Sequence, residues 1–83
     1  MNTTNYEKAL KLIDKGFACK HSTFKDTGCI FIDLGGGWRG YAFPKDKYVE
    51  VTIDNVHIGQ GNIDLDKMMV MDGNHNRHIK VIK

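Results

Sequence analysis

The hydrophobic periodicity of this chain changes at Gly16, and this change constrains the fold more than any other feature. Before Gly16, apolar side chains recur at helical spacing, as they do on one face of an amphipathic helix. After Gly16, apolar and polar residues alternate, and the helical period does not return. Because successive side chains of a strand point to opposite faces of a sheet, the alternation predicts strands joined by turns.

The N-terminal segment predicts a helix over residues 5–15. Thr4 and Glu7 have the spacing of a capping box, in which each side chain satisfies a free backbone N–H group of the other residue. Gly16 suits the left-handed conformation that ends many helices. The expected apolar stripe consists of Tyr6, Ala9, Leu10, Ile13 and Phe17. The basic stripe that we expect to face solvent consists of Lys8, Lys11 and Lys15.

The rest of the chain predicts short strands separated by turns that are rich in Gly, Asp and Asn. We expect the first strand over residues 17–24 and a turn over residues 25–28. Residues 29–34 are apolar enough for a central strand of the sheet. Residues 59–62 are expected to interrupt a later strand as a bulge or a loop. In the last strand, over 77–82, the inward-facing side chains are expected to be Ile79 and Val81, and the outward-facing ones His78 and Lys80.

These patterns predict one compact α+β domain over residues 1–83. Its N-terminal helix, at about 5–15, packs on an antiparallel, mostly meander sheet of five or six strands, because no helical pattern separates the strand segments. A chain of this length has no room for a second core.

Composition indicates a cytoplasmic protein without a membrane partner. No apolar run approaches the roughly 20 residues that span a bilayer, and the N-terminus lacks the apolar segment of a secretory signal. We therefore expect Cys19 and Cys29 to be reduced and mostly buried. We expect the protein to be a monomer or a small homo-oligomer.

A glycine-rich segment matches the pattern G-x-G-x-x-G at Gly35, Gly37 and Gly40. A dinucleotide-binding loop of this type opens a helix, whose N-terminus receives the pyrophosphate. Here the alternating residues 41–43 follow, which are typical of a strand. We therefore expect a turn between two strands and no nucleotide or other cofactor.

Metal binding and catalysis find little support in the residue pattern. Potential ligands do not occur as the two closely spaced pairs of a structural zinc site. Most Asp residues lie in expected turns, where they cap backbone groups, and no stretch resembles a nucleophile motif. We therefore expect no metal site and no catalytic residues, and we expect that the protein is not an enzyme.

The surface around Trp38 and Arg39 is the strongest candidate for binding, since Trp and Arg dominate the energetics of many interfaces. An alternative is that Trp38 is a core residue at the edge of the sheet. A second candidate surface is the basic C-terminal hairpin. The predicted binding residues are Trp38, Arg39, Tyr41, Tyr48, His75, Arg77, His78 and Lys80, with Lys8, Lys11 and Lys15 as a secondary basic stripe.

Two functions fit these surfaces. The first is a small, non-enzymatic protein that associates stoichiometrically with a protein or nucleoprotein partner, such as a virus-encoded inhibitor or modulator of host machinery. The alternative is direct binding of RNA or single-stranded DNA through aromatic and basic side chains. The alternative requires the basic residues to lie on one face, because the net charge of +2 is too small to favour nucleic acid by itself.

Overall fold

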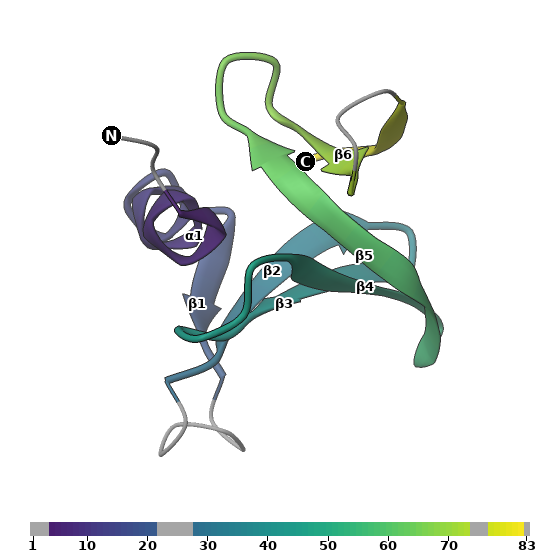
Figure 1. Ribbon diagram of the computed structural model, residues 1–83, viewed down its shortest axis with the longest axis horizontal. Coiled ribbons are helices and arrows are strands. Elements are labelled where there is room, and N and C mark those ends of the chain that lie inside the picture. Colours follow the sequence, from purple (N-terminus) through teal and green to yellow (C-terminus); the bar gives the residue numbers. More distant parts are fainter. Residues whose placement is uncertain (1–3, 22–27, 74–76, 83) are drawn as a thin grey trace.

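Helix α1 spans Asn5–Asp14 in a computed structural model that describes residues 4–21, 28–73 and 77–82 (Figure 1). The helix begins at the predicted capping box. The Glu7 backbone N–H donates to the Thr4 hydroxyl at 3.1 Å, and the Thr4 N–H donates to the Glu7 carboxylate at 3.5 Å. Gly16, just beyond the helix, has the left-handed φ of 88° that the sequence predicts.

In the part of the chain that the structure describes, seven strands follow α1 and form one antiparallel sheet, in which each strand pairs with its neighbours in sequence. The α+β meander is therefore confirmed. The expected number of five or six strands was wrong, since the described sheet has seven; the two edge strands, both predicted, are shorter than expected, with three and four residues. The strands are β1 (Ala18–Lys20), β2 (Ile30–Gly35), β3 (Trp38–Ala42), β4 (Val49–Ile53), β5 (Val56–Asp64), β6 (Met69–Asp72) and β7 (His78–Val81). Residues 22–27, with most of the first predicted turn, lie outside the described residues.

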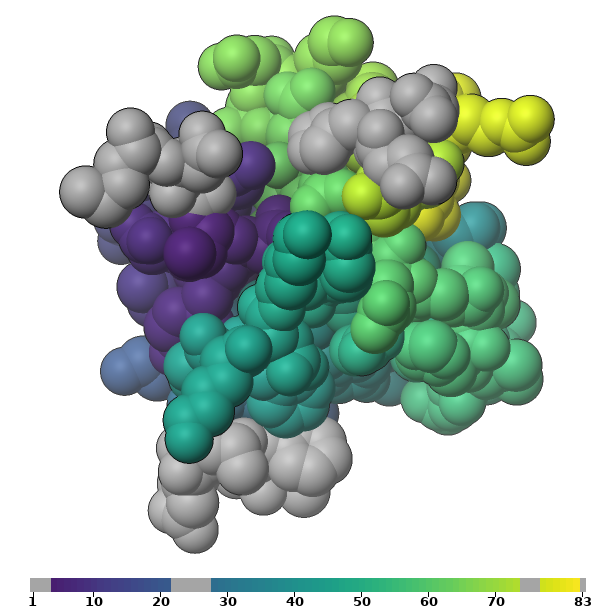
Figure 2. All heavy atoms as spheres, in the orientation of Figure 1, coloured from purple at the N-terminus to yellow at the C-terminus, as the bar shows by residue number. Residues whose placement is uncertain are grey.

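The core lies between α1 and one face of the sheet. Alternate side chains of β2 and β4 point toward it and are fully buried, as the period of the sequence predicts. α1 packs against β1, β2, β3 and β5, and its purple atoms touch the green atoms of the β5 region in Figure 2. The core cluster consists of Ala9, Leu12, Ile30, Ile32, Leu34, Ala42, Val49, Val51, Ile63, Val70 and Ile82.

The buried face of α1 differs from the predicted stripe. Leu12 is fully buried, whereas Leu10 is 39% exposed. The buried positions are Asn5, Ala9 and Leu12, which share one face at spacings of four and three residues. The expectation for Leu10 was wrong because Asn5, a polar residue, fixes which face of the helix turns inward.

Besides a register shift between Asp33 and Gly35 of β2, two bulges shift the register of the later strands in the described residues. In the first, Val51 pairs with Gly59 and Thr52 with His57, so Ile58 is an extra residue in β5. The bulge thus lies just before the predicted interruption at residues 59–62, and those residues pair within β5, which continues as one strand.

The second bulge, in β7, reverses the faces of the residues that follow it. Val70 pairs with Lys80 but Met71 pairs with His78, which leaves Ile79 as the extra residue. Ile79 packs against the core as predicted, but Val81 is 40% exposed, so its inward assignment was wrong. Ile82 is buried in its place.

Asn5 and Lys8 join α1 to β5 beyond the last pair between β4 and β5. The Ile63 N–H donates to Asn5 Oδ1 at 2.8 Å, and Lys8 Nζ donates to the Ile63 carbonyl at 3.0 Å. Asn5 Nδ2 also donates to the Lys47 carbonyl at 2.8 Å and to Asn62 Oδ1 at 3.0 Å. Lys8 is therefore half-buried and bonded, which corrects its place in a solvent-facing stripe.

We predict that Asn5→Ala lowers the free energy of unfolding by about 2–4 kcal/mol, because it leaves buried backbone groups without partners. Lys11→Ala, on the exposed side of the same helix, is expected to change it by less than about 0.5 kcal/mol. Urea denaturation followed by circular dichroism measures both values. Equal stability of the two variants would contradict this role of Asn5.

Candidate functional site

The sheet face turned away from α1 carries a cluster of aromatic and basic side chains. Phe31, Arg39 and Tyr41 alternate with the buried residues of β2 and β3, so they point to this outer face. The register places Cys19 opposite Phe31, and Phe31 opposite Tyr41. We name this surface the aromatic face, and it consists of Cys19, Lys20, His21, Phe31, Arg39 and Tyr41.

Three rings of the aromatic face lie close together. The ring centroids of Phe31 and Tyr41 are 5.8 Å apart, and that of His21 lies 5.6 Å from Tyr41 and 6.3 Å from Phe31. The Arg39 guanidinium carbon lies 5.8 Å from the centroid of the Phe31 ring, within the range of a cation–π contact. The six residues line an open concavity of about 440 Å³.

The turn between β4 and β5 holds the Arg39 side chain in place, and this turn is itself bonded to the loop between β2 and β3. Its Nη1 donates to Asn55 Oδ1 at 3.3 Å, in the turn between β4 and β5. The backbone N–H of Asp54 in the same turn donates to the Gly37 carbonyl at 3.0 Å, which joins this turn to the loop between β2 and β3. Residues 35–37 have φ values of 80°, 60° and 84°, and only glycine adopts such a run readily. The predicted turn is therefore confirmed, and its glycines serve the hairpin.

The carboxylates on the outer face are held by other groups. Asp33 Oδ1 accepts a hydrogen bond from the Gly35 N–H at 2.9 Å. Glu50 Oε2 lies 2.8 Å from His57 Nε2, and Glu50 Oε1 accepts from Gln60 Nε2 at 3.0 Å. The described residues that line the 440 Å³ concavity include Lys20 and Arg39 but no carboxylate.

Trp38 and Arg39 face opposite sides of β3. Trp38 is half-buried and packs against the core, with the Lys80 ammonium 5.9 Å from its ring centroid. Arg39 is exposed on the outer face. A single flat partner surface can therefore contact only one of them, although the sequence places the two side by side.

The remaining predicted residues lie apart from Arg39 and Tyr41. Tyr48 is half-buried just before β4, with the Lys47 ammonium 5.3 Å from its ring centroid. Arg77 and His78 are exposed at the start of β7, four strands from β3 in the sheet order. Lys11 on α1 and Lys15 at the C-cap of the helix are exposed, and His75 lies outside the described residues. Of the predicted residues that the structure describes, Arg39 and Tyr41 come together on the outer face, and Trp38 and Lys80 come together on the core side of β3.

Four members of the aromatic face were missed as site residues. Phe31 belongs to a segment interpreted as a buried central strand, yet it alternates with Ile30 and Ile32 and shares its parity with the polar Asp33. This alternation in the sequence could have shown that the Phe31 side chain lies on the outer face of the sheet. Cys19, Lys20 and His21 could not be added from local sequence, because only the pairing of β1 with β2 brings them beside Phe31. Cys19 is also exposed, which corrects its expected burial.

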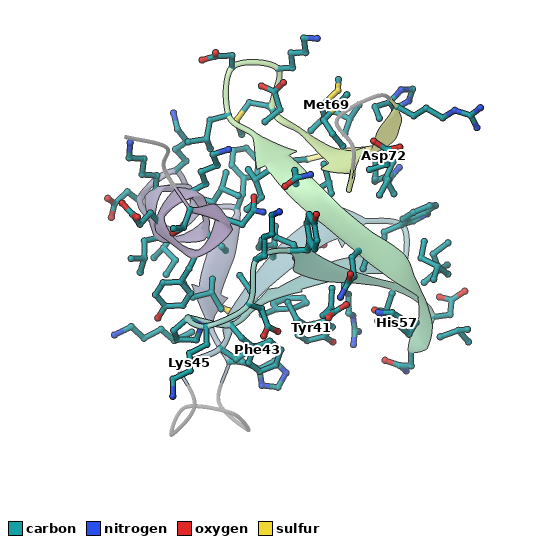
Figure 3. All side chains as sticks on the ribbon, viewed as in Figure 1. Tyr41, Phe43, Lys45, His57, Met69 and Asp72 are labelled. Atoms are coloured by element: carbon teal, nitrogen blue, oxygen red, sulfur yellow. The ribbon has the colours of Figure 1, made fainter. Side chains whose placement is uncertain are left out.

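Figure 3 shows the outer face on the lower side of the sheet, where Tyr41 and His57 lie, whereas Met69 and Asp72 lie at the opposite end of the molecule.

Among the described residues, no group of three or more His, Cys, Asp or Glu side chains could hold a metal ion. Within the same part of the chain, none of the helices has the length and apolar character needed to cross a membrane.

Comparisons of the chain with protein-family models, with curated proteins and with solved structures found no match.

The Glu50 carboxyl generates a pH-dependent prediction. Burial acts to raise its pKa, but the hydrogen bonds from Gln60 and His57, and the charge of His57, outweigh burial and hold the pKa below its ordinary value of 4.5. A carboxyl whose pKa is lower in the folded state stabilises the fold above the unfolded-state pKa, and the stabilisation disappears as the pH falls through the folded-state pKa.

We predict that Glu50→Gln lowers the free energy of unfolding by less than about 1 kcal/mol at near-neutral pH, because the carboxylate is partly exposed and screened. The difference from the unmodified protein shrinks once the pH is well below 4.5. Urea denaturation at about pH 6 and about pH 3 measures it. A difference that grows on acidification would contradict the assignment.

Proposed function

We propose that this protein is a small, non-enzymatic binding protein that acts by stoichiometric association with a protein or nucleoprotein partner, as an inhibitor or modulator. The observation that supports this proposal is the aromatic face, where aromatic rings and cations lie at the surface of the sheet. The other face of the sheet packs against α1. Tyr, Phe and Arg are residue types that supply binding energy at interfaces.

The positions of these side chains favour binding because they are set before a partner arrives. Phe31 and Tyr41 stand on adjacent strands at fixed register, and the Arg39 guanidinium is held by Asn55 and the Phe31 ring. Pre-positioned side chains lose less conformational entropy on association, which raises affinity. The concavity is open and shallow in character, which suits surface recognition more than enclosure of a reacting substrate.

The cysteines support action in the cytoplasm, which we include in the proposal. Cys19 and Cys29 are both free thiols. Cys29 is buried, and its burial raises the pKa of the thiol, so the less reactive protonated form is favoured. Free thiols are typical of reducing compartments.

Affinity capture with matched arginine variants tests the proposal. Tagged unmodified protein, Arg39→Glu and Arg77→Glu are expressed in the cells that naturally contain the protein, and the captured proteins and nucleic acids are quantified. We expect near-stoichiometric capture of one partner by the unmodified protein and by Arg77→Glu. Arg39→Glu is expected to reduce capture at least about tenfold, since charge reversal at an interface arginine is severe.

The two arginines are both exposed, so folding is expected to be unaffected, and circular dichroism verifies this. Equal capture by Arg39→Glu and the unmodified protein would contradict the aromatic face as the binding surface. Selective loss with Arg77→Glu would instead identify the C-terminal hairpin. Catalytic consumption of a captured molecule would contradict the non-enzymatic proposal.

A further inference from the structure

The rings of the aromatic face are arranged as a stacking platform. Phe31 and Tyr41 lie side by side on β2 and β3, and His21 lies within 6.3 Å of both rings, measured between centroids. Aromatic side chains on a sheet surface are the means by which several single-strand-binding folds hold nucleobases. Stacking tolerates any base sequence, since every base has a π face.

One permanent cation, Arg39, shares the face of these rings. Lys20 also lines the concavity, from the edge strand β1, where it pairs with Ile30, and the described lining contains no carboxylate. The nearest carboxylates on the outer face, Asp33 and Glu50, accept hydrogen bonds from Gly35, and from Gln60 and His57. The concavity therefore combines aromatic surface with local positive charge, which complements a ligand that carries both aromatic rings and phosphates.

The concavity continues into a second hollow. A neighbouring depression of about 220 Å³ shares Cys19 and Phe31 with the 440 Å³ concavity and runs beside β1 toward Gly16. Its lining also includes Asp33, whose carboxylate accepts a hydrogen bond from the Gly35 N–H. Together the two hollows form an open track along β1 and β2. Such a track admits a single strand with unstacked bases, whereas a duplex keeps its bases inside the helix.

We propose that the aromatic face binds single-stranded nucleic acid, with bases stacked on Phe31 and Tyr41 and with phosphates contacted by Arg39 and Lys20. This inference rests on the proposed function, because it takes the partner to be a nucleoprotein and names single-stranded nucleic acid as the component that the same surface contacts. Trp38 takes no part, since it points to the core side of β3. An acidic protein segment would also meet Lys20 and Arg39, but it would not use adjacent rings as a repeating stacking surface.

Fluorescence anisotropy with labelled oligothymidylate and oligouridylate of about 12 nucleotides tests this inference, and a duplex of equal length serves as the comparison. At about 50 mM NaCl we expect dissociation constants of about 1–100 μM for at least one single strand and at least about tenfold weaker binding of the duplex. The two single strands distinguish RNA from DNA as the preferred source of the same chemistry.

The same anisotropy measurement on substituted proteins tests which residues of the aromatic face contact the oligonucleotide. Tyr41→Ala is expected to weaken binding about 5- to 150-fold, the range for loss of one stacked base. Arg39→Gln is expected to weaken it and to reduce the slope of log affinity against log salt by about 0.7, whereas Arg77→Gln changes affinity by less than about twofold. Trp38 emission is expected to stay constant on binding. If Tyr41→Ala does not fold, Arg39→Gln at an exposed position still provides the test.

Several outcomes would overturn the inference: absence of binding to both single strands, equal affinity for the duplex, or equal loss with Arg39→Gln and Arg77→Gln. Absence of oligonucleotide binding together with Arg39-dependent capture of a protein would overturn only this inference and leave the proposed function standing. Absence of both would overturn the two together.

Discussion

β5 extends beyond Gly61, which is its last residue that pairs with β4. Beyond that point, two side chains of α1 form hydrogen bonds with the backbone of β5. Asn5 accepts from the Ile63 N–H, and Lys8 donates to the Ile63 carbonyl. An exposed ladder edge would otherwise invite pairing with another chain. The same contacts turn Ala9 and Leu12 toward the sheet, so one polar residue sets both the position and the rotation of the helix.

Because α1 is held on one side, the two faces of the sheet have different surroundings. The inner face of β2–β4 forms the core, and the outer face of the same strands carries rings, cations and hydrogen-bonded carboxylates. The alternation of β3 separates Trp38 from Arg39, and the turn hydrogen bond to Asn55 fixes the guanidinium near Phe31. The proposed function therefore depends on the parity of side chains along β3, which follows from where the helix docks.

Much of the fold could be predicted from local pattern. The capping box and the glycine turn each depend on residues close together in sequence, and each was found as expected. The bulge in β5 lies at Ile58, just before the residues where it was expected. The faces of β7 could not be predicted, because the bulge at Ile79 depends on how β7 pairs with β6. The candidate site was predicted only at Arg39 and Tyr41, since Phe31 and its neighbours join them through strand register.

The central claim is that binding takes place on the sheet face opposite α1. Amide NMR of the ¹⁵N-labelled protein with saturating oligothymidylate tests it residue by residue. The account predicts that the largest chemical-shift changes occur at residues 19–21, 31 and 39–41, with small changes over β7 and at Lys11 and Lys15 of the helical segment. The largest changes at residues 77–81, or on the exposed side of α1, would contradict the account.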